Sequence, residues 1–216
     1  MGYKPENTLA SFAHALDMGC TWLELDVYVV EDEVVVIHDE TLERTTNGRG
    51  KLGDKTLAYV RSLDAGDGQH VPLLREVIDL VDHQAVINIE LKGDGTARAV
   101  SELLGRYCAQ GASADEFLLS SFRHDELAKA DPAYRRGALF GRKSSHDYFT
   151  VTDKLGAYSL NLDLAIASRE TVEAAHERGL KVFVYTVNEP DDIARMRAIG
   201  VDGVFTNYPD RVIGVA

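Results

Sequence analysis

Two short segments, Trp22–Val27 and Val86–Lys92, alternate apolar and polar residues with a period of two. Because successive side chains of a β-strand point to opposite faces, each segment has one apolar and one polar face. The polar faces carry Glu24 and Asp26 in the first segment and Asn88, Glu90 and Lys92 in the second. Carboxylates are costly to bury unless a positive charge compensates. The pattern therefore predicts either a cation site or the solvated face of a half-exposed antiparallel sheet.

The rest of the chain repeats a unit of an amphipathic helix, a glycine and a strand. Glycine ends helices readily, and strands that alternate with helices are typical of parallel βα units. The α/β class follows from this alternation. The expected parallel strands are Trp22–Val27, Val86–Leu91, Phe117–Phe122, Gly137–Phe140, Ala157–Leu162, Lys181–Val187 and Gly203–Thr206.

One apolar run, Val34–Ile37, breaks this order because it follows the first strand after only a short acidic turn, Glu31–Glu33. No helix fits between the two runs, so we expect Val34–Ile37 to fold back as an antiparallel strand. This return would bring His38 and Asp39 close to the carboxylates of the first strand. The polar segment from 40 to 71 is then expected to be an excursion loop.

Composition is that of one soluble domain of 216 residues, with 45% hydrophobic residues. The 23 basic and 35 acidic residues give a net charge of −12, which argues against nucleic acid or an anionic membrane as a partner. No apolar run reaches membrane-spanning length. Cys20 and Cys108 form no disulfide framework and suit a reducing compartment. We therefore expect a cytoplasmic protein with no stable membrane association.

Eight short motifs follow one another along almost the whole chain. They are Pro-Glu-Asn-Thr at 5–8, Glu-Leu-Asp-Val at 24–27, Val-Ile-His-Asp at 36–39, Thr-Leu-Glu-Arg-Thr-Thr-Asn-Gly at 41–48, Ile-Glu-Leu-Lys at 89–92, Ser-Ser-Phe at 120–122, Val-Tyr-Thr-Val-Asn at 184–188 and Thr-Asn-Tyr-Pro-Asp at 206–210. In order and spacing they resemble the glycerophosphodiester phosphodiesterase family, particularly its short bacterial cytosolic members. The resemblance implies a TIM (β/α)8 barrel of the phospholipase C-like phosphodiesterase type. It would form one domain over residues 1–216, with a small insertion at about 40–71.

The family resemblance also implies a reaction, the hydrolysis of glycerophosphodiesters to glycerol 3-phosphate and an alcohol. One divalent cation, Mg²⁺ or Ca²⁺, would bind to Glu24, Asp26 and Glu90, since carboxylate oxygens are the ligands that such hard ions prefer. These residues stand at the carboxyl ends of predicted strands, where barrel enzymes form their active sites. His38 would act as a general acid or base, because imidazole titrates near neutral pH.

Three further residues are candidates for substrate binding. Lys92 shares a strand face with Glu90 and would bind phosphate, although a salt bridge that only neutralises Glu90 is the structural alternative. Arg44 in the excursion would reach a phosphate, or would be one more surface arginine. Tyr185 stands where many family members carry tryptophan, and would shape the glycerol pocket or belong to the core.

The chain differs from the family at its N-terminal end. Family members open with a strand that carries His-Arg-Gly a few residues before Pro-Glu-Asn-Thr, whereas this sequence begins at Met1-Gly2-Tyr3-Lys4. We expect the first barrel strand to be absent, together with its histidine and arginine. A gap would then separate Trp22–Val27 from Gly203–Thr206. We expect the protein to be less stable than a full barrel, to associate into a homo-oligomer through the exposed edges, or to fill the gap with other residues.

Three functional hypotheses remain open at this stage. The first is an active phosphodiesterase whose natural N-terminus is longer. The second is a pseudo-enzyme or binding module that retains the metal and the phosphodiester but turns over poorly. The third is an unrelated metal-dependent barrel lyase or isomerase, for which Lys92 would have to serve as the base. The full set of motifs argues against the third.

Overall fold

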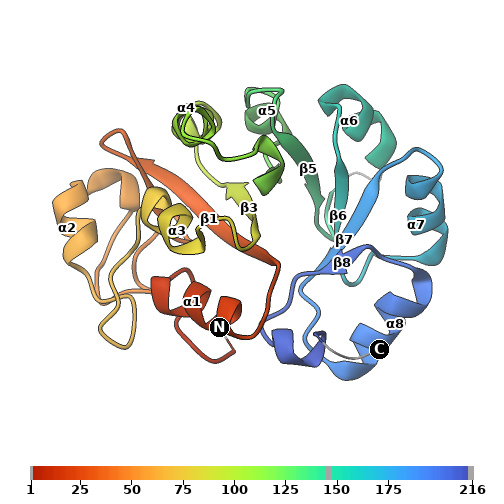
Figure 1. Cartoon of the computed structure of the whole chain (residues 1–216), viewed down its shortest axis with the longest axis horizontal. Coiled ribbons are helices and arrows are strands. Elements are labelled where there is room, and N and C mark those ends of the chain that lie inside the picture. The colour runs from red at the N-terminus through yellow and green to blue at the C-terminus, as the bar shows by residue number, and fades with distance from the viewer. Residues whose placement is uncertain (1, 145–146, 214–216) are drawn as a thin grey trace.

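The computed structural model of the protein describes residues 2–144 and 147–213. Its strands form one curled sheet in the order β2-β1-β3-β4-β5-β6-β7-β8, with helices along the outer face (Figure 1). The strands are β1 (Trp22–Val30), β2 (Glu33–Val36), β3 (Val86–Leu91), β4 (Phe117–Ser121), β5 (Arg135–Phe140), β6 (Ser159–Asp163), β7 (Lys181–Tyr185) and β8 (Gly203–Val204). The helices are α1 (Leu9–Asp17), α2 (Leu57–Ser62), α3 (Leu74–Val81), α4 (Thr96–Ala109), α5 (His124–Leu127), α6 (Tyr148–Leu155), α7 (Arg169–His176) and α8 (Pro190–Ile199).

Strand β2 is the antiparallel member of the sheet. It pairs with the second half of β1, from Val27 opposite Val36 to Val30 opposite Glu33. Glu31 and Asp32, which join the two strands, both have positive φ values of 47° and 68°. Two consecutive positive φ values are the signature of the turn that best matches the twist of a β-hairpin. The predicted antiparallel return is therefore confirmed.

The seven remaining strands are parallel, and the sheet they form is open. In the part of the chain that the structure describes, β8 pairs only with β7, and the Trp22–Asp26 half of β1 pairs only with β3. Trp22, at the start of β1, has its ring 5.5 Å from the ring of Phe183 in β7. The fold is a curled, TIM-like half-barrel with the expected break between its first and last parallel strands, and homo-oligomer formation through those edges remains a prediction.

Apolar side chains on the outer face of the sheet pack beneath the helices and form the main core, which includes Leu25, Ile89, Leu119, Leu160 and Val182. None of the helices in residues 2–144 and 147–213 is long and apolar enough to cross a membrane. The interior face is different, because it carries buried polar side chains where many barrels carry branched apolar ones. These side chains are Asp26, Asn88, Glu90, Ser120, Ser159 and Asn161.

The excursion between β2 and α3 is more ordered than the sequence analysis expected. It contains helix α2 and a short 3-10 helix, Leu52–Asp54. Its apolar residues form a second core cluster with Val35, on the face of β2 opposite to the main core, and Leu42, Leu52 and Val60 in this cluster are fully buried. Reading this segment as a loop was therefore wrong in detail: its apolar residues are too widely spaced for a visible period, and burial against β2 organises them.

We predict that Gly137→Ala destabilises the protein by roughly 1–3 kcal/mol, the usual cost of overpacking. A Cβ atom at Gly137 in β5 would lie 2.8 Å from Asn161 Nδ2 and 2.9 Å from Ser159 Oγ, closer than side chains normally approach. Gly105→Ala is the matched control, because a Cβ atom there meets nothing within 4 Å on the exposed face of α4. That change should stabilise the helix by about 0.5–1 kcal/mol. Urea unfolding of both variants tests the packing, and a Gly137→Ala protein as stable as the wild type would contradict it.

Candidate active site

Three carboxylates meet on the inner face of the sheet, two from the first half of β1 and one from the carboxyl end of β3. Glu24 and Asp26 come from β1 and Glu90 comes from β3, where Asp26 is the register partner of Glu90. One carboxylate oxygen from each residue lies within 4.8 Å of the other two. Asp26 and Glu90 are buried, whereas Glu24 stands on the open edge of β1 and is exposed. The structure thus brings together the three residues that the sequence analysis selected.

The donor set of this cluster suits a hard divalent cation. All three ligands are oxygens, and such an ion binds carboxylate oxygens at about 2.0–2.6 Å. Oxygens within 4.8 Å of one another can therefore contact a single ion placed between them. The cluster could hold one cation, and the geometry alone does not select between metals.

Electrostatics in the cluster also favour a bound cation. Burial raises the pKa of Glu90 to about 7, and the charge of Asp26 adds to this effect while Lys92 opposes it. Desolvation of its carboxyl group, with the charges of Asp26 and Glu90, raises the pKa of Glu24 well above the usual range. The three groups therefore resist carrying full negative charge together. A positive ion between them would remove that resistance.

Lys92 is the positive charge that the protein itself supplies. Its Nζ atom lies 3.0 Å from Glu90 Oε1 and 3.4 Å from Asp26 Oδ1. Burial acts against the charged form of Lys92, but the neighbouring carboxylates of Glu90 and Asp26 outweigh it and raise the pKa of the amine. The ammonium group therefore stays charged beside the cluster, as both the phosphate-binding and the salt-bridge hypotheses for Lys92 require.

Asn7 is a site residue that the sequence analysis missed. Its Nδ2 donates to Asp26 Oδ2 at 2.9 Å, and its Oδ1 accepts from the backbone N–H of Asp26 at 3.3 Å. Thr8 caps helix α1, and Asn7 stands just before it at a φ of 55°. Asparagine tolerates this left-handed conformation better than most residues. The Pro-Glu-Asn-Thr motif was the available signal.

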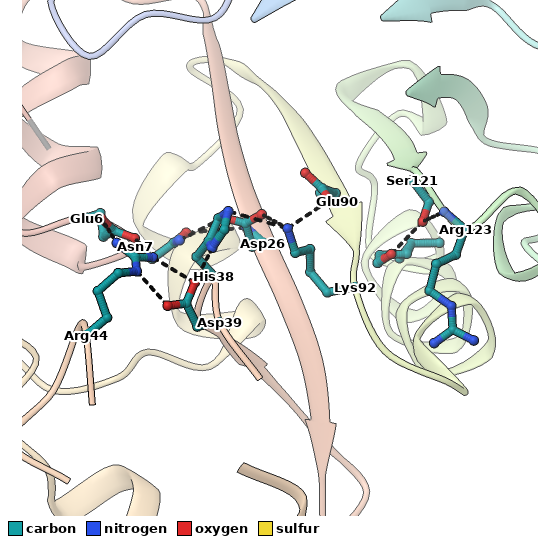
Figure 2. Close-up of polar contacts among 11 residues, drawn as sticks. Glu6, Asn7, Asp26, His38, Asp39, Arg44, Glu90, Lys92, Ser121 and Arg123 are labelled. Carbon is teal, nitrogen blue, oxygen red and sulfur yellow. Dashed lines mark hydrogen bonds and ion pairs between the residues drawn. The ribbon is translucent and has the colours of Figure 1, made fainter. Parts of the chain in front are cut away.

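A chain of charged side chains leads away from His38 (Figure 2). His38 Nδ1 is hydrogen-bonded to Asp39 Oδ1, and His38 Nε2 lies 3.5 Å from Lys92 Nζ. Asp39 in turn accepts from Arg44 Nε at 2.5 Å, and Arg44 binds Glu6 through two further contacts of 2.7 and 2.9 Å. The Arg44 guanidinium, and then His38, hold the pKa of Asp39 well below its usual range.

This arrangement bears on the predicted role of Arg44. The two carboxylates of Asp39 and Glu6 occupy both edges of the guanidinium. A phosphate would have to displace one of them, so a phosphate contact by Arg44 stays a prediction. Glu6 and Asp39 are partners that spacing alone did not reveal, since Glu6 lies 38 residues from Arg44.

Tyr185 lies at the end of β7 within a group of aromatic rings. Its hydroxyl donates to the Phe140 carbonyl at 2.8 Å, and its ring lies 5.7 Å from Phe122 and 6.4 Å from Phe205. Burial, with a smaller contribution from Asp163, raises the pKa of the phenol. Phe122 keeps 43% of its surface exposed. Tyr185 thus stands at the inner edge of an apolar wall that opens to solvent through Phe122.

A curled sheet of parallel strands with a carboxylate cluster, a lysine and a histidine at its carboxyl edge defines a phosphodiesterase-type barrel. Residues 1–211 match the model of the glycerophosphoryl diester phosphodiesterase family. The chain is 35% identical to a glycerophosphodiester phosphodiesterase of Caldanaerobacter subterraneus subsp. tengcongensis, over 98% of this chain and 92% of the relative. It is also 35% identical to a glycerophosphodiester phosphodiesterase of Bacillus altitudinis, over 99% and 94%.

Solved structures agree with these relatives. A phosphodiesterase of Oleispira antarctica, in complex with the product sn-glycerol-3-phosphate, superposes with a TM-score of 0.89 at 28% identity, over 98% of this chain and 91% of that chain. A glycerophosphodiester phosphodiesterase of Agrobacterium tumefaciens gives a TM-score of 0.81 at 27% identity, over 97% and 93%. This chain belongs to the glycerophosphoryl diester phosphodiesterase family.

We predict that Mg²⁺ or Ca²⁺ raises the melting midpoint, because an ion that binds only the folded state stabilises it. At one hundred times the dissociation constant the expected gain is about 2.7 kcal/mol, or roughly 5–10 °C for a domain of this size. Glu90→Gln should remove most of the gain. Glu102→Gln, on the exposed face of α4, should leave it unchanged. An equal response of the wild type and Glu90→Gln would exclude the cluster as the binding site.

The gain in melting midpoint should also depend on pH. Because the pKa of Glu90 is raised from 4.5 to about 7, its protonated form stabilises the metal-free fold; this contribution is complete below about pH 4.5 and is lost as the pH rises to about 7. Protons and cations compete for the same oxygens, so the gain from the cation should grow over that window. Melting curves at about pH 5 and about pH 8, with and without the cation, measure it. A gain that falls with rising pH would contradict the assignment.

Proposed function

We propose that this protein hydrolyses glycerophosphodiesters to sn-glycerol 3-phosphate and an alcohol, with one divalent cation, Mg²⁺ or Ca²⁺, held by Glu24, Asp26 and Glu90. The observation that carries the proposal is the convergence of these carboxylates with Lys92 and His38 at one edge of the sheet. Membership of the family supports it independently. The two free cysteines, Cys20 and Cys108, support a reducing compartment, and we place the activity in the cytoplasm.

A bound divalent cation supplies Lewis-acid chemistry, because it polarises a non-bridging phosphate oxygen and offsets developing negative charge. Lys92 adds a second positive charge at the same place, and its ammonium would hold another phosphate oxygen. In the free protein this ammonium is shared between Glu90 and Asp26. The salt bridge and the phosphate contact are therefore two states of one side chain.

His38 is the group that would move a proton. Its Nδ1 is engaged by Asp39, so the ring is held with Nε2 towards Lys92 and the carboxylates. Nε2 can then take a proton from an attacking hydroxyl or give one to the departing alkoxide. An alkoxide is a poor leaving group near neutral pH, so proton donation contributes substantially to the rate. The side chain of His38 is 45% exposed, which leaves room for a substrate to approach.

Arg44 and Tyr185 take supporting roles in this proposal. The contacts of Arg44 with Asp39 support an action through His38, with direct phosphate binding as the alternative. Tyr185 would bound the glycerol pocket with the apolar face of its ring, since its hydroxyl is engaged by Phe140. The second candidate is a binding module that retains cation and diester but turns over slowly. It is favoured because, among the described residues, His38 is the one histidine that contacts Lys92, so a single histidine would have to serve as both acid and base.

The experiment that tests this function measures release of sn-glycerol 3-phosphate from glycerophosphocholine by the 216-residue chain. Release should need Mg²⁺ or Ca²⁺ and should stop when EDTA is added. Cation-dependent binding of the substrate without release would favour the binding module. Release that survives EDTA would contradict the metal-dependent mechanism.

We predict that His38→Ala lowers kcat by about 10²–10⁴, the usual contribution of a positioned acid or base. The stabilisation by Mg²⁺ or Ca²⁺ should persist, because His38 is not among the three carboxylates of the cluster. His176→Ala is the matched control, since that histidine is bound to Asp202 at the other end of the sheet. If His38→Ala turned over at the wild-type rate, His38 would have no role in proton transfer.

A separate prediction distinguishes the two roles of Arg44. If Arg44 acts through Asp39, Arg44→Gln should lower kcat roughly tenfold or more and change the pH profile while KM stays nearly constant. If Arg44 binds phosphate equally in the ground and transition states, KM should rise with kcat unchanged. Arg98→Gln, on the exposed face of α4, controls for the lost charge. Steady-state kinetics across pH decide, and we expect the first pattern.

A further inference from the structure

The end of strand β3 is held by a hydrogen bond that the regular sheet does not provide. Backbone pairing between β3 and β4 runs from Ile87 opposite Phe117 to Glu90 opposite Ser120 and stops there. One residue further on, the Ser121 hydroxyl donates to the Leu91 carbonyl at 2.6 Å and accepts from the Arg123 backbone N–H at 2.9 Å (Figure 2). The hydroxyl therefore continues the connection between the strands beyond the ladder.

The carbonyl of Leu91 belongs to the peptide group whose other polar atom is the N–H of Lys92. That N–H donates to the Val27 carbonyl of β1 at 3.2 Å. Strand β4 thus holds one end of this peptide group and β1 holds the other. Because the peptide group is planar, fixing both polar atoms fixes its orientation. The Cα atom of Lys92 lies in the same plane, so the point from which its side chain enters the site is set as well.

Two adjacent serines of β4 provide an internal comparison. Ser120 and Ser121 are both completely buried. Within residues 2–144 and 147–213, Ser120 Oγ has no hydrogen-bond partner, whereas Ser121 Oγ has two. Loss of the Ser121 hydroxyl would leave the buried Leu91 carbonyl without this donor, which is unfavourable. Loss of the Ser120 hydroxyl removes no such partner.

We propose that Ser121 is a positioning residue for Lys92. Its hydroxyl holds the Leu91–Lys92 peptide group so that the ammonium stays 3.0 Å from Glu90 and 3.4 Å from Asp26, where it meets the phosphate of the substrate. This role rests on the proposed function only in so far as Lys92 binds phosphate. Ser121 itself touches neither substrate nor cation, and acts through Lys92.

The experiment is a double-mutant cycle with Ser121→Ala and Lys92→Met, with Ser120→Ala as the matched control. Calorimetry measures the affinity of each protein for sn-glycerol 3-phosphate in the presence of Ca²⁺. We expect Ser121→Ala to weaken binding about tenfold, from loss of one well-placed hydrogen bond. The same change should have little effect once Lys92 is already replaced. Ser120→Ala should bind as the wild type does, and Ser121→Thr, which keeps the hydroxyl, should recover much of the affinity.

Thermal melting of the four ligand-free proteins of the cycle gives a second readout. A serine that acts through Lys92 should lower the melting midpoint less in the Lys92→Met background than in the wild type. Additive effects on both affinity and midpoint would show that Ser121 is merely structural and would overturn the proposal. If wild-type protein with Ca²⁺ bound no sn-glycerol 3-phosphate, the proposed function would fail, and the midpoints alone would still decide the role of Ser121.

Discussion

Glu24, Asp26 and Glu90 place three like charges on the interior face of the sheet, where each is costly unless a positive charge lies beside it. Much of the surrounding structure reduces that cost. Lys92 supplies one positive charge from the same strand as Glu90, and the Asn7 side chain donates to Asp26. These contacts compensate the cluster only in part, since the pKa of Glu90 stays near 7 and that of Glu24 well above normal. The remaining imbalance is what a divalent cation would neutralise.

A second set of charges orients the histidine from the opposite side. Glu6 binds Arg44, Arg44 binds Asp39, and Asp39 binds His38. The imidazole ring is therefore held by Asp39, and Asp39 is itself held by two hydrogen bonds from Arg44. His38 reaches the cluster only because β2 folds back along β1. The hairpin thus brings His38, the proposed proton-transfer group, beside the cluster without the helix that separates the parallel strands. Lys92 Nζ, 3.5 Å from His38 Nε2, joins the two sets.

Backbone contacts at the carboxyl edge complete this support. The peptide group before Lys92 is fixed by Val27 on one side and by Ser121 on the other. Glu24, in contrast, lies on a stretch of β1 that pairs with β3 on one side only, and it is exposed. The site therefore has a firmly held half, formed by β3 and β4, and a more open half beside β1. Because the charges of the three carboxylates interact, protonation of Glu24 or of Glu90, whose pKa values are raised, affects the charge of the other.

The sequence by itself determined the alternation of strands and helices, the antiparallel return of β2 and the identity of the three converging carboxylates. Periodicity and strand polarity are local properties, and parallel strands bring their carboxyl ends to one edge, so residues at those ends could be grouped in advance. The family motifs added the expected reaction. Strand ends were less well placed, most of all at β8, where only Gly203–Val204 pairs.

Only the tertiary structure decided which partner each polar side chain takes. Nothing in the spacing of Glu6 and Arg44, or of Ser121 and Leu91, indicated that they would meet, since these pairs are 38 and 30 residues apart. The fold of the excursion likewise depends on burial against β2 rather than on a local period. Hydrogen-bond partners depend on distances of a few tenths of an ångström between separate elements, and those distances arise only when the elements pack.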